Sequence, residues 1–263
     1  MKSVLAVALL SSLFVACSGE RQENQAAEYA EGEVQADAVA PEEINIHPIS
    51  HASFVLTHDD ITIYNDPTGG AGAYERFGEP DIILISDIHG DHMNIETLVA
   101  LHHDEVILVM PQAVADKLPD SLKTTAHILA NGSSAQVKGV GIEAIPMYNL
   151  PEAEDSRHPK GRGNGYVLTL GEKRVYIAGD TEDIPEMRSL QHIDMAFVPM
   201  NLPYTMPVDQ AADGVLAFAP HVVYPYHYRG KGGLSDVEQF KNLVESSGKD
   251  IEVRLVDWYP NMD

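Results

Sequence analysis

The run from Ser86 to His92 constrains this chain more than any other part of its sequence. It comes directly after the apolar stretch Asp81-Ile82-Ile83-Leu84-Ile85, which predicts a buried β-strand ending in a turn. Two carboxylates and two imidazoles this close together are costly to bury unless a cation gathers them. The run therefore predicts a metal site at a strand end, with a solvated acidic loop as the alternative. Its potential ligands are Asp87, His89, Asp91 and His92.

Three later positions have the same character. Asp180 follows the apolar stretch Tyr176-Ile177-Ala178, with Gly179 allowing close approach of the backbone. His227 ends the stretch Tyr224-Pro225-Tyr226, and His158 lies in a glycine-rich loop before another apolar stretch. If these strand ends meet at one edge of a sheet, they supply enough ligands for two cations, with Asp180 bridging them.

The pattern of strands and helices indicates an α/β domain. Short apolar stretches separated by turn formers predict strands, and Gly165–Leu170 with Lys173–Ala178 predicts a hairpin turning at Gly171-Glu172. Helical periodicity predicts helices over 94–102 and 208–218, and a last helix that starts at a Ser235 N-cap with Glu238 as its capping-box partner. Strands that alternate with helices favour sheets covered by helices. The other predicted strands are 53–57, 61–64, 82–85, 106–110, 141–145, 195–198 and 221–224.

The order Asp87-x-His89-x-Asp91-His92, then Gly179-Asp180-Thr181, then His227 resembles the metallo-β-lactamase superfamily of metal-dependent hydrolases. The resemblance covers about residues 46–230 and implies a four-layer αβ/βα sandwich. The branch that it resembles most contains ascorbate-phosphate lactonases and N-acyl-phosphatidylethanolamine phospholipase D. The stretches His51–Phe54 and Asn65–Pro67 are similar to the opening strands of that branch.

The resemblance implies a dinuclear metal centre. In the family a hydroxide bound to both metals attacks the substrate, and Asp91 would be the catalytic residue that orients it. The bond attacked would be an ester, a lactone or a phosphodiester. One metal would bind Asp87, His89 and His158, the other Asp91, His92 and His227, and Asp180 would bridge them.

Two positions depart from the family pattern. Asp87 stands where the family has histidine, and a carboxylate makes the first site less selective for zinc and more favourable to manganese or iron. Zinc is still the expected metal, with manganese or iron as alternatives. The third histidine of the first site falls by spacing on Asn149, and we expect His158 to fold back in its place.

Other polar residues are candidates for contact with the substrate or with the metal ligands. His51 and Asp66 could hydrogen-bond to ligands, although His51 is equally compatible with the core and Asp66 with a turn before Pro67. Lys160 and Arg162 flank His158 and could receive a phosphate or carboxylate of the substrate, or lie in a solvated loop. Tyr204 is the expected aromatic contact to the substrate.

The N-terminal 43 residues differ in composition from the rest. Residues 1–16 have the layout of a secretory signal, and the small residue before Cys17 resembles a bacterial lipoprotein cleavage box. Residues 17–43 are acidic and almost free of large apolar side chains, which predicts a flexible tether. We expect residues 44–263 to form the hydrolase domain. Ser18 after Cys17 favours lipid anchoring in the outer membrane of a bacterial envelope, with a periplasmic protein as the alternative.

The charge limits the partners. Of the net charge of −23, the signal contributes +1, the tether −7 and the domain −17, which argues against nucleic acid as a partner. We expect a small-molecule substrate and membrane contact through lipid on Cys17. Two alternatives remain open: a phosphodiesterase or phospholipase-like enzyme, favoured by Lys160 and Arg162, and a non-catalytic metal-binding lipoprotein.

Overall fold

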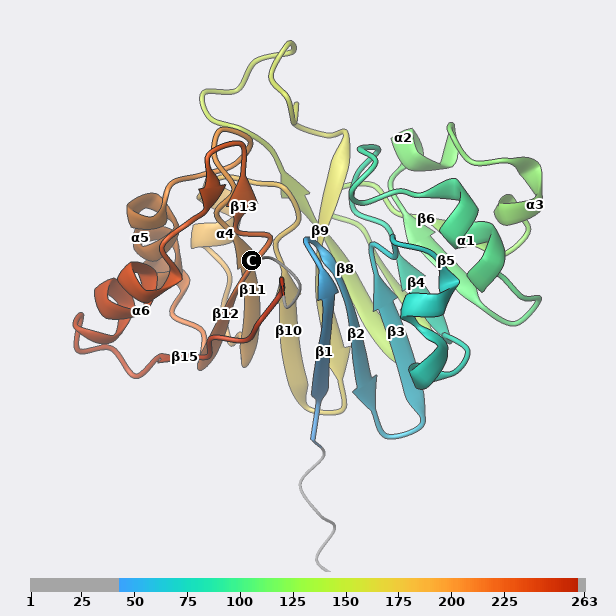
Figure 1. Ribbon diagram of the computed structural model, residues 1–263, viewed down its shortest axis with the longest axis horizontal. Coiled ribbons are helices and arrows are strands. Elements are labelled where there is room, and N and C mark those ends of the chain that lie inside the picture. The colour runs from blue at the N-terminus through green and yellow to red at the C-terminus, as the bar shows by residue number, and fades with distance from the viewer. Residues whose placement is uncertain (1–42, 260–263) are drawn as a thin grey trace, which may run out of the picture. The chain divides into compact units, whose positions relative to one another are not determined.

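Two β-sheets face each other in a computed structural model that describes residues 43–259 (Figure 1). The first sheet has its strands in sequence order: β1 (Asn45–Ser50), β2 (Ser53–His58), β3 (Ile61–Asn65), β4 (Ile82–Leu84), β5 (Ile107–Met110) and β6 (Ala126–Ile128). The second sheet has the order β15 (Glu252–Val253), β12 (Val222–Tyr226), β11 (Met195–Pro199), β10 (Lys173–Ile177), β9 (Gly163–Leu170), β8 (Val140–Met147) and β7 (Ser134–Val137). A short hairpin joins β13 (Arg229–Gly230) to β14 (Gly233–Leu234).

Helices cover the outer face of each sheet, which completes four layers (Figure 1). The alternation of side chains along β4 shows why: Ile82 and Leu84 pack in the cluster between the sheets, whereas Ile83 packs beneath the helices. Strands with both faces buried appear in the sequence as continuous apolar stretches. The first sheet carries the 3-10 turns η1 (Ala71–Ala73) and η2 (Glu75–Phe77) and the helices α1 (Ile95–Leu101), α2 (Gln112–Ala115) and α3 (Asp120–Lys123). The second carries α4 (Pro185–Arg188), α5 (Val208–Phe218) and α6 (Val237–Glu245).

Parallel strands at the centre of both sheets bring chemically important residues to one end. β3, β4 and β5 run parallel, and so do β10, β11 and β12. The carboxyl ends of parallel strands share one edge, and loops at such an edge commonly form binding sites. The residues that follow β3, β4, β10 and β12 include Asp66, Asp87, Asp180 and His227.

The predicted α/β class and four-layer sandwich are confirmed, and so is the hairpin between β9 and β10, in which Leu170 pairs with Lys173. The predicted start of the last helix is wrong by one residue. Asp236 is the N-cap of α6 and accepts from the Gln239 amide at 2.8 Å, whereas the Ser235 hydroxyl donates to the carbonyl of Met200.

Strand β1 is absent from the predicted set. It is an edge strand, it contains Pro48 and a bulge between Pro48 and Ser50, and most of its residues are half-buried. The proline and the bulge weaken the alternation of apolar and polar residues on which strand prediction rests.

The predicted signal segment, Cys17 and the tether up to residue 42 lie outside the described residues. Within 43–259, no helix has the length and apolar character needed to cross a membrane.

Gly179 links β10 to Asp180, and we expect its replacement by alanine to lower the free energy of unfolding. Its φ is +70°, and an added Cβ would lie 2.5 Å from the Met147 sulfur. Gly139→Ala is the matched control, because Gly139 has φ +84° with no atom near an added Cβ. In urea unfolding of the metal-free protein, the control should lose about 1–2 kcal/mol from backbone strain alone. Gly179→Ala should lose a further ~1–3 kcal/mol from overpacking, and equal losses would contradict the close approach.

Candidate metal centre

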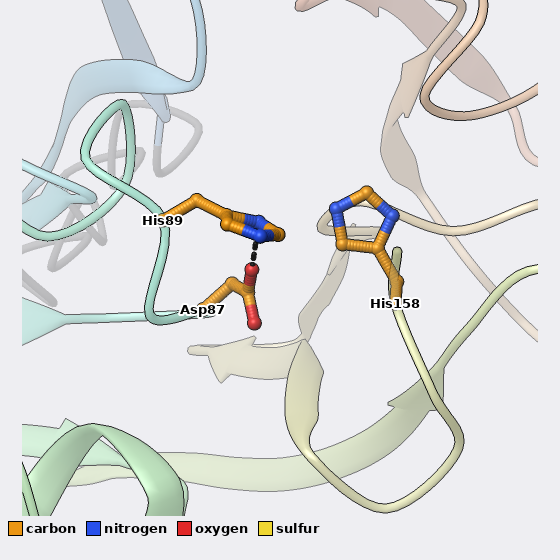
Figure 2. Close-up of side chains that lie close together, drawn as sticks. All are labelled: Asp87, His89 and His158. Atoms are coloured by element: carbon orange, nitrogen blue, oxygen red, sulfur yellow. Dashed lines mark ion pairs between the residues drawn. The ribbon is translucent and has the colours of Figure 1, made fainter. Parts of the chain in front are cut away.

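Six Asp and His side chains converge in two groups at the shared end of the sheets. Asp87, His89 and His158 form one group, and Asp91, His92 and His227 form the other. Within each group the candidate ligand atoms all lie within 4.8 Å of one another. Figure 2 shows the first group, with Asp87 and His89 in contact and the His158 ring approaching from the loop between β8 and β9.

Asp180 lies between the two groups, almost fully buried. Its Oδ2 is 3.1 Å from His158 Nε2 and 3.2 Å from His92 Nε2, and its Oδ1 is 3.3 Å from His227 Nε2. Burial by itself raises the pKa of Asp180, but the charges of His227 and His92 and the nearby imidazole of His158 hold that pKa well below its usual range. The carboxylate is therefore charged, and it requires positive charge around it.

Asp66 orients one of these imidazoles. Its Oδ1 accepts from the Ser86 amide at 2.7 Å, and its Oδ2 accepts from the Ser86 hydroxyl at 2.6 Å and lies 2.8 Å from His92 Nδ1. Nε2 of His92 is left to face Asp180. Burial lowers the pKa of His92, but the carboxylates of Asp180 and Asp66 on its two sides raise it well above the usual value. Hydrogen bonds of this kind fix the ring orientation of metal-binding histidines.

Asn149 has the same relation to His158. Its Oδ1 accepts from the His158 amide at 2.9 Å and lies 3.2 Å from His158 Nδ1, so the ring presents Nε2 to Asp180. The amide group of Asn149 is held in turn by the carbonyl of Tyr204 at 2.9 Å. Of the two candidates for the third position of the first group, the structure brings His158 into the cluster and uses Asn149 to orient it.

Arg162 forms an ion pair with Asp87 instead of extending into solvent. Its Nε and Nη2 donate to the two oxygens of Asp87, each at 3.1 Å, while His89 Nδ1 lies 2.5 Å from Asp87 Oδ2. Burial raises the pKa of Asp87, but the His89 hydrogen bond and the charges of His92, His89 and Arg162 lower it to about 2. Both oxygens of the Asp87 carboxylate accept hydrogen bonds, whereas Oδ1 of Asp180 accepts none from the described residues.

The remaining predicted residues lie around this cluster. Lys160 forms ion pairs with Glu186 at 2.9 Å and Glu152 at 3.1 Å, which tie down the loop that carries His158. The His51 ring packs edge-on against His227 with centroids 5.4 Å apart, and Tyr204 lines a hollow beside them.

Three of the residues at this site have strained backbones. His51, Asp66 and His227 have φ of +52°, +44° and +45°, in the left-handed region that non-glycine residues rarely adopt. Such strain persists where the surroundings enforce it, and it concentrates at functional sites.

Sequence reasoning missed Ser86 and Asn201. Ser86 bonds to Asp66, and Asn201 Nδ2 lies 3.4 Å from His227 Nε2. Asn201 follows β11, so the strand-end rule that selected Asp180 and His227 could have found it. No sequence pattern could have predicted that Arg162 binds Asp87, because 75 residues separate them.

Comparison with known proteins agrees with this geometry. The family model described as the beta-lactamase superfamily domain matches residues 45–227, and so spans most of the chain and all the candidate metal-binding residues. The chain belongs to the metallo-β-lactamase superfamily. It is a metal-dependent hydrolase, as are the relatives with which it aligns over most of their length.

The relatives include a UPF0173 metal-dependent hydrolase from Pyrococcus abyssi, 29% identical over 216 residues, which cover 78% of this chain and 94% of that protein. A crystal structure of a protein from Parabacteroides distasonis, named a metal-dependent hydrolase, is 39% identical with a TM-score of 0.72, covering 81% of this chain and 93% of that one. The metallo hydrolase Igni18 from Ignicoccus hospitalis, at 24% identity and a TM-score of 0.69, covers 81% of this chain and 95% of that one and shares the fold. These relatives favour an enzyme over a non-catalytic metal-binding lipoprotein.

Asp66→Asn should weaken metal binding by about 10–100-fold, because the ring of His92 loses the carboxylate that orients it. Competitive titration of the metal-free protein with a zinc chelator measures this. Asp59→Asn is the control, since Asp59 also has positive φ (+50°) but lies in an exposed turn. Equal affinities for zinc in the two variants would contradict the role of Asp66.

Arg162→Gln should destabilise the metal-free protein by about 3 kcal/mol, because it leaves the buried Asp87 carboxylate without its cation. Zinc should restore part of that loss, since a metal ion can take the place of the guanidinium. Arg174→Gln breaks a partly exposed pair with Glu143 and should cost less than ~1 kcal/mol, with no response to zinc. Thermal unfolding with and without zinc measures these differences. An identical stabilisation by zinc in both variants would contradict the idea that a metal ion can take the place of the Arg162 guanidinium beside Asp87.

Proposed function

We propose that the chain hydrolyses an ester, lactone or phosphodiester bond at a dinuclear metal centre. The observation that supports two metals is the position of Asp180, whose Oδ2 faces His158 and His92 while its Oδ1 faces His227. One metal would be held by Asp87, His89 and His158, the other by Asp91, His92 and His227, with Asp180 shared.

The donor atoms fit metal ions better than they fit one another. Among the described residues, His92 Nε2, His158 Nε2 and Asp180 Oδ1 are buried polar atoms that form no hydrogen bond of acceptable geometry. Buried polar atoms without a partner are costly, and in native proteins they indicate a missing ion or water. Neutral imidazole and carboxylate together suit zinc, manganese or iron, and we propose zinc first.

Metal ions bound here would lower the pKa of a water molecule and polarise the bond to be cleaved. We assign the orientation of the attacking water to Asp91. With 43% of its side chain exposed, Asp91 is the most accessible of the seven candidate ligands, and it lines the hollow next to the cluster. His227 forms an ion pair with this carboxylate, with Nε2 3.5 Å from Oδ2.

The candidate bonds remain the three that suit such a centre: an ester, a lactone and a phosphodiester. Membership of the lactonase and phospholipase branch is part of the proposal, supported by the position of Asp66 after β3 and of His51 beside His227. Lys160 and Arg162 gave the reason to favour a phosphodiesterase, but both are engaged with carboxylates of the protein. A phosphodiester is therefore no longer favoured over a carboxylic ester on their account.

We further propose a bacterial envelope location, with lipid on Cys17 and the outer membrane as the site. The support is the sequence of the first 43 residues. Labelling with a fatty acid followed by fractionation tests it, and Cys17→Ser should release an unlabelled protein from the membrane fraction.

Removal of metal should abolish hydrolysis. Protein purified without added metal should contain about two transition metal ions per chain by elemental analysis, and a chelator should remove them together with activity on a panel of lactone, phosphodiester and carboxylic ester substrates. Re-addition of zinc, manganese or iron identifies the productive ion.

His89→Ala and His227→Ala should each lose metal and at least about 100-fold in kcat/KM. His127→Ala serves as the control, because His127 is exposed on β6. Full metal content and full activity in His89→Ala would refute the proposed centre.

A further inference from the structure

A hollow of about 340 Å³ opens beside the proposed metal centre, and basic side chains line part of it. It lies over His227 and Asp91, which belong to the second ligand group. A volume of this size suits a small substrate. The lining residues are His51, Asp91, Asn201, Tyr204, His227, Arg229, Gly230 and Lys231.

Among the described residues, no carboxylate pairs with Arg229 or Lys231. In residues 43–259 most basic side chains are paired with an acid, and those pairs involve Lys123, Lys138, Lys160, Arg162, Lys173, Arg174, Arg188, Lys241 and Arg254. The described lysines and arginines without an acidic partner are Arg76, Lys117, Arg157, Arg229, Lys231 and Lys249. Two of these six, Arg229 and Lys231, line the hollow, and the guanidinium of a third, Arg157, stacks 4.6 Å over the ring of Tyr204, which also lines it.

The backbone that carries the two cations is held in place. Lys231 donates its amide to the carbonyl of Leu202 at 2.9 Å, and the Arg229 amide donates to the Tyr259 hydroxyl at 3.3 Å. Gly230 between them lies so close to Leu202 that an added Cβ would be 1.8 Å from its carbonyl oxygen. Both cations are thus fixed at the backbone two and four residues after His227, and preorganisation of this kind lowers the cost of binding.

We propose that this hollow binds an anionic group of the substrate, a phosphate or a carboxylate, through Arg229, Lys231 and Arg157. The inference rests on the proposed function, because it places that group next to the bond cleaved at the metal centre. An acidic domain repels anions elsewhere on its surface, so unpaired cations gathered here give a local attraction. Lys160 and Arg162, which follow His158 on its loop, are neutralised by carboxylates of the protein itself.

Binding of simple anions tests the proposal without requiring turnover. Zinc-loaded protein is titrated calorimetrically with inorganic phosphate and, separately, with succinate. Arg229→Gln/Lys231→Gln should weaken the Kd of the preferred anion by about tenfold or more, as expected for lost charged hydrogen bonds. Lys117→Gln/Lys249→Gln removes the same charge from unpaired cations that do not line the hollow, and it should bind as the parent does. The tighter of the two anions identifies the group.

Equal affinities in the two double variants would overturn the proposal, since the anion would then be held without Arg229 and Lys231. If neither anion binds at concentrations up to about 10 mM, the affinity is far weaker than that of a specific site, and the proposal is overturned as well. A neutral ester, 4-nitrophenyl acetate, separates this result from the proposed function. Metal-loaded protein that is inactive on this ester and on the panel of lactone, phosphodiester and carboxylic ester substrates, but loses anion binding on Arg229→Gln/Lys231→Gln, would refute the proposed hydrolysis of these bonds and keep the anion site.

Discussion

The structure of the site depends on one buried carboxylate. Asp180 is surrounded by nitrogen atoms of three histidines from three different loops, and charge in such a position is stable only beside positive charge. Gly179 brings this carboxylate into the cluster, and the positive φ of His227 turns that imidazole toward it. Parallel strands in two facing sheets supply the common edge at which these loops meet. Metal-dependent chemistry is thus a consequence of where the strands end.

The second feature that defines this chain is the partner of Asp87. The superfamily resemblance places histidine there, and a carboxylate brings one more negative charge into a dry site. Arg162 supplies the compensating charge through two parallel hydrogen bonds, an arrangement that a lysine cannot reproduce. His158, four residues earlier on the same loop, completes the first group in the place that spacing assigns to Asn149. One loop therefore accommodates both departures from the family pattern.

The sequence predicted the fold class and the residues that gather at the sheet edge, because both follow from apolar strands ending in polar loops. Contacts between distant segments could not be predicted. The pairing of Arg162 with Asp87 and the contact of Tyr259 with His51, 3.4 Å apart and 208 residues apart in sequence, depend on how the loops pack. The capping residue of α6 was missed by one position because Ser235 and Asp236 are both good N-caps, and a backbone carbonyl binds the serine instead.

Whether Asp180 joins two metal ions is tested most directly by anomalous diffraction from crystals of the zinc-loaded protein, recorded on both sides of the zinc absorption edge. We expect two anomalous peaks about 3.5–4 Å apart, one contacted by His89 and His158, the other by Asp91, His92 and His227, with Asp180 touching both. A single peak, or two peaks of which neither contacts Asp180, would contradict this expectation.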